Sequence, residues 1–214
     1  WTNSTFSGMP AFQISARYPA NIFNKIYQTV NSGFKTGNFT LIALVGFYIL
    51  LVSLGINPWL AIGGAIAYAL STYFFIIIEV GHNSKTMALA LLPPIVAGVL
   101  LVFRQKYIAG SAVLAFFLPL NLVANHPQMT YYFFIALSIF ILIEGIQALK
   151  TMQLISFLKP AGVLAIIGLL ALGSNCTLLW MTNEYGKYST RSKSELTLNK
   201  DVQTSGLDKD YATD

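Results

Sequence analysis

The sequence contains few charged residues for its length. Of its 214 residues, only 10% are Asp, Glu, Lys or Arg, whereas 55% are hydrophobic. Soluble domains carry about 25% charged residues. The mean hydropathy of +0.63 is correspondingly high. This shortage of charge excludes an ordinary soluble domain and predicts a membrane protein.

Cysteine and clustered positive charge are also scarce. The single cysteine, Cys176, has no partner for an internal disulfide and lies in an apolar run, where we expect a small core residue. The net charge of +5 is spread over the loops and the C-terminal tail, without a basic stripe that contains interleaved aromatic residues. Nucleic acid is therefore excluded as an expected partner.

Six apolar runs approach the roughly 20 residues that cross a bilayer core as a helix. These runs, within residues 39–180, are 39–55, 59–78, 86–103, 107–124, 129–149 and 157–180. Since backbone groups inside a bilayer must be satisfied within the protein, the runs predict an all-α, polytopic transmembrane helix bundle. Pro93 and Pro94 are expected to kink the third span or to break its hydrogen-bond ladder.

The segment before the first run contains a different pattern. Within residues 17–36, apolar side chains recur at helical spacing from Ile22 to Val30, and Asn, Lys and Gln occupy the opposite face. This pattern predicts an amphipathic helix within the loop 1–38. Such a helix is too polar to span the bilayer, and it either lies in the membrane interface or packs on the bundle.

The two ends of the chain carry no targeting pattern. The sequence begins at Trp1 in a polar, turn-rich segment, without the basic and apolar regions of a signal peptide. Residues 181–214 form a polar tail of mixed charge. We expect the chain to be a fragment whose tail begins a further external region or a linker.

Basic residues indicate how the spans are oriented. Six spans place the connections 56–58, 104–106 and 150–159 on one face, and all the charged residues of these loops are basic. The short loops of the other face, 79–86 and 125–128, contain Lys85 as their single basic residue. The positive-inside rule therefore predicts that the first face is cytoplasmic, and that both polar loops and both ends of the chain are external.

Concentrated polar side chains occur in the two loops that are predicted to be external. They are Glu79, His82, Asn83 and Lys85 in EVGHNSK, and Asn121, Asn125, His126 and Gln128 in NLVANHPQ. Both histidines of the chain lie in these loops. Because the two loops share a face, we expect the clusters to form parts of one site.

Glu79 interrupts an apolar run at the membrane edge. An ionisable group at such a depth costs a few kcal/mol and normally faces a partner. One interpretation makes Glu79 a metal ligand or a base and Lys85 a phosphate contact. The alternative is a structural ion pair between Glu79 and Lys85 that holds two helices together, and residue spacing alone favours neither.

The histidines and one further acid are open to similar alternatives. His82 and His126 can bind a metal or a phosphate near neutral pH, or they are loop histidines with a structural role. Their spacing matches no dedicated metal-binding motif. Glu144, near the predicted cytoplasmic end of the fifth run, is expected to pair with Lys150 or to extend towards the interface.

Four blocks of the sequence carry a family resemblance. They are WTNSTFSGMP, EVGHNSKTMALALLP, LVANHPQMTYYFF and YSTRSKSEL. Together they resemble the YfhO-like family of bacterial integral membrane proteins, in the version found in Bacteroidetes, over essentially the whole chain. That family is related to the C-type (GT-C) glycosyltransferases, which transfer a sugar from a polyprenyl-phosphate carrier to an acceptor on the outer face of the membrane.

The resemblance implies a GT-C-like bundle in the bacterial inner membrane, with the polar loops periplasmic. The implied reaction is an inverting displacement that transfers a sugar to a cell-envelope polymer. Glu79 or His82 would hold a divalent cation (Mg²⁺ or Mn²⁺) or the leaving phosphate, and Lys85 would offset charge on that phosphate. Asn83, Asn125, His126 and Gln128 would contact the substrate.

The family's early catalytic acid has no counterpart in this chain, because residues 1–38 contain no Asp or Glu. That acid would lie upstream of Trp1, and the fragment alone would be inactive. A transporter or flippase is the main rival interpretation, since a broken helix at Pro93 and Pro94 would be typical of transporters. A non-catalytic scaffold for envelope polymers is the second rival.

Overall fold

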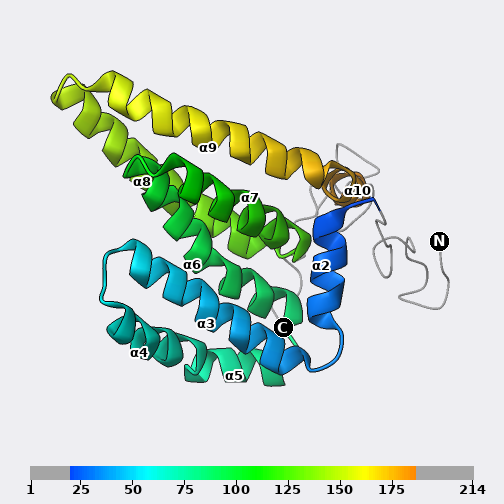
Figure 1. Cartoon of the computed structure of the whole chain (residues 1–214). Coiled ribbons are helices and arrows are strands. Elements are labelled where there is room, and N and C mark those ends of the chain that lie inside the picture. The colour runs from blue at the N-terminus through cyan, green and yellow to red at the C-terminus, as the bar shows by residue number, and fades with distance from the viewer. Residues whose placement is uncertain (1–19, 187–214) are drawn as a thin grey trace, which may run out of the picture.

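The computed structural model describes residues 20–186, which form helices joined by short turns, with no strand in this range (Figure 1). The helices are α2 (Ile22–Asn31), α3 (Lys35–Ser53), α4 (Pro58–Ala69), α5 (Thr72–Glu79), α6 (Asn83–Phe103), α7 (Tyr107–Val123), α8 (Pro127–Lys150), α9 (Leu154–Ser174) and α10 (Cys176–Gly186). The expected all-helical class is confirmed. The expected polar segments before residue 20 and after residue 186 lie outside the described residues.

Five helical segments are long and apolar enough to cross a membrane. They are Lys35–Ser53, Pro58–Glu79, Asn83–Phe103, Pro127–Lys150 and Leu154–Ser174. The apolar helix α7 is shorter, at 17 residues. The protein is therefore a multi-pass membrane protein, as its shortage of charge predicts.

Helix α6 lies at the centre of the bundle, with α3 and α7 as its main neighbours (Figure 1). It is the most buried of the long helices that could span a membrane, because α3 and α7 pack along it. Val99 and Val102 of α6 pack in one cluster with Leu114 and Leu118 of α7. Because both polar loops adjoin α6 or its neighbour α7, this helix positions the candidate site.

Glycines allow α6 to approach both neighbours closely. A Cβ added at Gly46 of α3 would lie 2.8 Å from Cδ of Pro94, and one added at Gly110 of α7 would lie 2.8 Å from the Gly98 carbonyl oxygen. Real side chains do not approach other atoms this closely, so each contact requires a residue without a Cβ atom.

The two prolines of the third span do not end its helix. Helix α6 is continuous from Asn83 to Phe103, so the prolines leave the helix unbroken, but they interrupt its hydrogen-bond ladder, which is one of the two expected effects. Pro93 has no N–H and cannot donate to the Leu89 carbonyl. That carbonyl instead accepts a hydrogen bond from the hydroxyl of Tyr68 in α4, at 3.2 Å. Neighbouring helices thus provide the donor that the proline removes.

The second expected span, 59–78, is interrupted. Helix α4 ends at Ala69, and Ser71 adopts an extended conformation with φ −64° and ψ 143° before α5 begins. The Ser71 hydroxyl makes no capping hydrogen bond, so the extended backbone at this residue is what separates the two helices. The apolar run therefore contains two helices, which the uniform hydrophobicity conceals.

The last expected span, 157–180, is also interrupted. Helix α9 ends at Ser174, and α10 begins at Cys176 in a different direction (Figure 1). Between them, the side chain of Asn175 donates to the Pro119 carbonyl of α7, and this bond competes with continuation of the helix. Cys176 is exposed, not a core residue as expected.

The loops gather at two ends of the bundle. At one end, the Arg104 guanidinium donates to the Ser53 carbonyl and joins the α6–α7 turn to the end of α3. At the opposite end, the Asn121 amide donates to the Ala88 carbonyl and joins the end of α7 to the beginning of α6. The polar loops 79–86 and 125–128 therefore share the second end, as the sequence predicts.

Helix α2 crosses the end of the bundle that carries the polar loops (Figure 1). Its apolar side chains Phe23, Ile26, Tyr27 and Val30 pack against a buried cluster that includes Met87 of α6. The predicted amphipathic helix is confirmed. The helix packs on the bundle, and its location in the membrane interface stays a prediction.

Candidate functional site

The first polar loop is a tight turn between α5 and α6. Gly81 has a φ of +81°, a left-handed conformation that glycine adopts without steric cost. The Gly81 and His82 amides donate to the carbonyls of Ile78 and Ile77, both at 2.9 Å. This turn leaves the side chains of Glu79, His82 and Asn83 exposed at the end of the bundle.

Lys85 lies in the first turn of α6 and contacts an aromatic ring. Its Nζ is 5.3 Å from the centroid of the Tyr73 ring in α5. Among residues 20–186, no ion pair within 4.0 Å joins Lys85 to Glu79, so the structural ion pair is not formed. A cation–π contact fastens α5 to α6 in its place. The Glu79 carboxylate remains available to a ligand.

The second polar loop is held by His126. This residue precedes α8, and its Nδ1 accepts a hydrogen bond from the Met129 amide at 3.4 Å. The bond matches the structural alternative for His126, and it places the proton of the neutral ring on Nε2. Asn125 adopts a left-handed φ of 51°. The side chains of Asn125 and Gln128 are exposed.

A buried hydrogen-bond network joins α6, α7 and α8 beside the two loops. Asn121 is 1% exposed, and its Nδ2 donates to the Ala88 carbonyl at 3.0 Å. Its Oδ1 accepts from the Thr130 hydroxyl, also at 3.0 Å. The Thr130 amide and hydroxyl both donate to the His126 carbonyl. These bonds therefore hold α6, α7 and α8 together at the end of the bundle that carries both loops.

A second polar network attaches α2 to this end. The Asn21 Oδ1 accepts from the Phe23 and Asn24 amides and caps α2. Its Nδ2 donates to the Ser174 carbonyl at 2.8 Å and to Asn175 Oδ1 at 3.0 Å. The position of α2 is thus determined by hydrogen bonds to the end of α9 as well as by apolar packing.

The structure brings some of the predicted site residues together and leaves others apart. Asn121 and His126 are joined through Thr130. No hydrogen bond or ion pair in the described range joins the first cluster to the second. Thr130 and Asn175 were not among the predicted site residues, although a polar residue inside an apolar run is the signal that could have identified them.

The described side chains do not assemble a metal centre. No group of three or more His, Cys, Asp or Glu residues within 20–186 is placed to hold a metal ion. Glu79 alone does not provide the several oxygen ligands that Mg²⁺ or Mn²⁺ requires. The metal expectation therefore finds no donor set here, and no chemical step below depends on a metal.

The first loop nevertheless combines a carboxylate, an imidazole, an amide and an ammonium group within seven residues at one membrane edge. Such a set can bind an anionic group through the ammonium and imidazole and exchange protons through the imidazole or carboxylate. Comparisons of the sequence with protein-family models, curated proteins and solved structures give no significant match. The resemblance to the YfhO-like family thus stays a prediction.

Proposed function

We propose that this chain is part of a membrane glycosyltransferase of the YfhO-like, GT-C-related type. It would take a sugar from a polyprenyl-phosphate carrier and transfer it to a cell-envelope acceptor at the external face of a bacterial inner membrane. The observation that carries the proposal is the pair of exposed side chains, Glu79 and His82, beside the half-buried Lys85 at the beginning of α6, at the bundle end that also holds the second polar loop.

The proposed chemistry is displacement of the carrier phosphate from the anomeric carbon of the sugar. The bond from this carbon to the phosphate oxygen breaks as the acceptor oxygen attacks, and negative charge develops on the leaving phosphate. Lys85 would stabilise this charge electrostatically. His82 and Asn83 would donate hydrogen bonds to the phosphate, and Glu79 would orient the sugar or its carrier.

The second loop would bind the sugar. Because Nδ1 of His126 accepts from the Met129 amide, Nε2 would be the ring atom that donates to a sugar or phosphate oxygen. Asn125 and Gln128 would provide further amide groups. Activation of the acceptor is assigned to a carboxylate outside the described residues, so the full-length protein is the appropriate subject for assay.

A transporter remains the second candidate. The broken helix expected at Pro93 and Pro94 is absent, but the second span is discontinuous at Leu70 and Ser71. Discontinuous spans are typical of transporter binding sites near the bilayer midplane. Movement of a lipid-linked sugar into sealed vesicles without covalent change would favour this function over transfer.

The test measures transfer of a labelled sugar from a polyprenyl-phosphate-linked donor by the full-length protein. We expect Lys85→Met to lower transfer by about 100-fold, the effect of losing one preorganised charge contact. Methionine retains the apolar stem and removes the ammonium group. We expect Glu79→Gln to lower transfer by about tenfold or more, on the same principle.

Lys35→Ala provides a matched control. Lys35 is an exposed lysine at the beginning of α3, at the same end of the bundle. The Lys35→Ala substitution should leave sugar transfer unchanged, because no proposed substrate contact involves Lys35. Wild-type transfer in both the Lys85 and Glu79 variants, at equal expression, would reject the proposed site.

A further inference from the structure

A second pocket lies at the opposite end of the bundle, away from both polar loops. It encloses about 280 Å³ between the end of α6, the end of α8 and the beginning of α9. Its polar lining includes Glu144, Gln105, Gln147 and Gln153. This is the end that carries the basic turns, which is predicted to be cytoplasmic.

Glu144 is a half-buried carboxylate without a counter-charge. The expected pairing with Lys150 is not formed, and within residues 20–186 the Glu144 side chain has no hydrogen-bond or ion-pair partner. A carboxylate inside a membrane-spanning helix is costly unless a cation accompanies it. The pocket therefore lacks a positive group in front of Glu144.

Aromatic rings indicate which kind of cation fits. Phe103 and Phe157 line the same pocket, and their ring centroids are 6.2 Å apart. A metal ion would require several oxygen ligands and would gain little from these rings. An organic ammonium group can donate hydrogen bonds to Glu144 and to the glutamine oxygens while it contacts an aromatic face.

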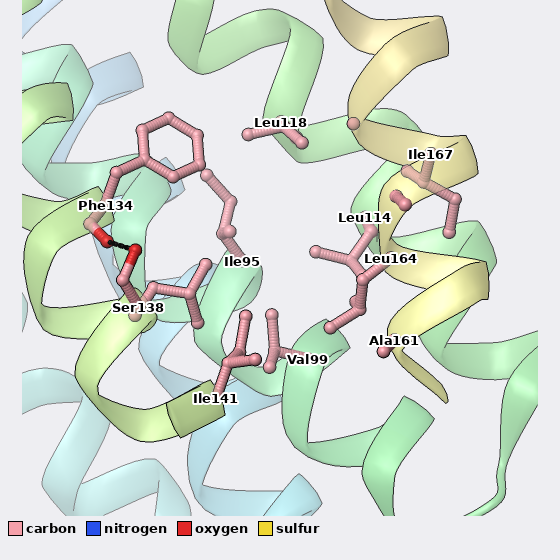
Figure 2. Close-up of a pocket in the computed structure, with 13 residues that line it drawn as sticks. Ile95, Val99, Leu114, Leu118, Phe134, Ser138, Ile141, Ala161, Leu164 and Ile167 are labelled. Carbon is pink, nitrogen blue, oxygen red and sulfur yellow. Dashed lines mark hydrogen bonds between the residues drawn. The ribbon is translucent and has the colours of Figure 1, made fainter. Parts of the chain in front are cut away.

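An apolar cavity lies one helical turn from this pocket along α6, α8 and α9. Figure 2 shows the side chains that line the cavity. It encloses about 290 Å³, and its lining side chains come from α6, α7, α8 and α9. The hydroxyl of Ser138, the polar side chain in this lining, is occupied by a 2.7 Å hydrogen bond to the Phe134 carbonyl. The cavity is therefore suited to a hydrocarbon chain.

The two cavities follow the same helices. Val99 of the apolar cavity is one turn from Phe103 of the polar pocket on α6, Ile141 is one turn from Glu144 on α8, and Ala161 is one turn from Phe157 on α9. A polar pocket at the membrane edge above an apolar cavity matches the arrangement of a phospholipid, which joins a charged headgroup to hydrocarbon chains.

We propose that α6, α8 and α9 form a binding site for a phospholipid with a primary-ammonium headgroup. The ammonium group binds the Glu144 carboxylate, and one acyl chain occupies the apolar cavity. The lipid phosphate faces the exposed lysines of the same end, Lys106 and Lys150. Positive lysines at the rim and negative Glu144 inside the pocket are complementary to such a zwitterionic headgroup.

This site does not depend on the proposed sugar transfer, because it lies at the other end of the bundle. The test uses the whole chain in bilayer nanodiscs that contain equal amounts of phosphatidylethanolamine, phosphatidylcholine and phosphatidylglycerol with identical acyl chains. Native mass spectrometry measures the lipids retained after release. We expect phosphatidylethanolamine to be retained about tenfold more than either other lipid, the effect of one charge-assisted hydrogen bond.

Two variants examine the two halves of the site. Glu144→Gln removes the charge at constant shape and should abolish the preference. Gly168→Leu should fill the apolar cavity, since Gly168 lines it and a Cβ added there meets nothing within 4 Å. Gly162→Leu is the matched control on the same helix, because Gly162 is exposed and a Cβ added there also meets nothing within 4 Å. The Gly162→Leu variant should retain the lipid.

Three results would overturn the proposal. One is equal retention of the three lipids by the wild type. Another is an unchanged preference in Glu144→Gln. The third combines two observations: free ethanolamine displaces the lipid, and Gly168→Leu and Gly162→Leu retain equal amounts of lipid. Together they would show that the pocket binds a soluble amine. A thermal melt of each variant separates these results from misfolding.

Discussion

The hydroxyl of Tyr68 replaces the amide that Pro93 lacks. It donates to the carbonyl of Leu89 at 3.2 Å, and Leu89 is the residue whose helical donor would be the amide of residue 93. The Tyr68 ring is held in place by Phe47, which stacks on it with the ring centroids 4.3 Å apart. The contact links α4 to α6 and explains how α6 continues through its prolines.

Tyr68→Phe should lower the free energy of unfolding by about 1–2 kcal/mol, because the half-buried Leu89 carbonyl is left without a donor. In a Pro93→Ala background, the amide of residue 93 should donate to the Leu89 carbonyl. In that background, Tyr68→Phe should leave the free energy of unfolding nearly unchanged. Unfolding in mixed detergent micelles measures both values. Equal losses in the two backgrounds would show that the hydroxyl does not compensate for the proline.

Thr130→Val tests the buried network that joins α6, α7 and α8. We expect a loss of stability of about 1 kcal/mol, because Asn121 Oδ1 loses its buried donor. In a double-mutant cycle with Asn121→Leu, the two changes should be strongly non-additive. The matched control is Thr40→Val, since the Thr40 hydroxyl donates within its own helix. Additive effects of Thr130→Val and Asn121→Leu would contradict the network.

Gly46→Ala should destabilise the bundle by about 1–3 kcal/mol, because the new methyl group forces α3 away from Pro94 and the Ala90 carbonyl. Gly63→Ala is the control, as a Cβ added there meets nothing within 4 Å. Gly63→Ala should raise the free energy of unfolding by about 0.5–1 kcal/mol, because alanine favours the helix more than glycine does. Thermal unfolding in detergent compares the two variants, and a stabilised Gly46→Ala protein would contradict the close contact.

Cysteine labelling tests the proposed orientation. In a Cys176→Ser background, Asn83→Cys should react with a membrane-impermeant maleimide in cells whose outer membrane alone is permeabilised. Gln105→Cys should react only after the inner membrane is opened, because basic turns remain cytoplasmic. Both residues are exposed at opposite ends of the bundle. The reverse labelling pattern would place the polar loops in the cytoplasm.

The apolar runs predicted most of the helices, because membrane helices must be long and hydrophobic regardless of their partners. The amphipathic spacing from Ile22 to Val30 likewise predicted α2. The interruptions at Ser71 and Asn175 were missed, because a single polar residue barely changes the hydropathy of an apolar run. The Asn175 interruption also involves a hydrogen bond to α7, which is distant in sequence. Hydropathy averages over such residues and cannot locate them.

The candidate site was predictable only in part. Glu79, His82, Lys85 and His126 could be selected because ionisable residues are rare in this chain. Their relations could not be derived from spacing. Lys85 contacts the Tyr73 ring although spacing allowed an ion pair with Glu79, and the geometry of two adjacent helices decides between these contacts.

The sequence by itself determined that this chain resides in a membrane, crosses it several times as helices, and places its polar loops at one end. These properties follow from composition and from the parity of spans, which need no knowledge of packing. Only the tertiary structure decided which groups meet. Asn121 binds Ala88, Tyr68 binds Leu89, and Glu144 faces a pocket without a cation. Such contacts join residues that are distant in sequence, and they depend on the crossing of helices in three dimensions.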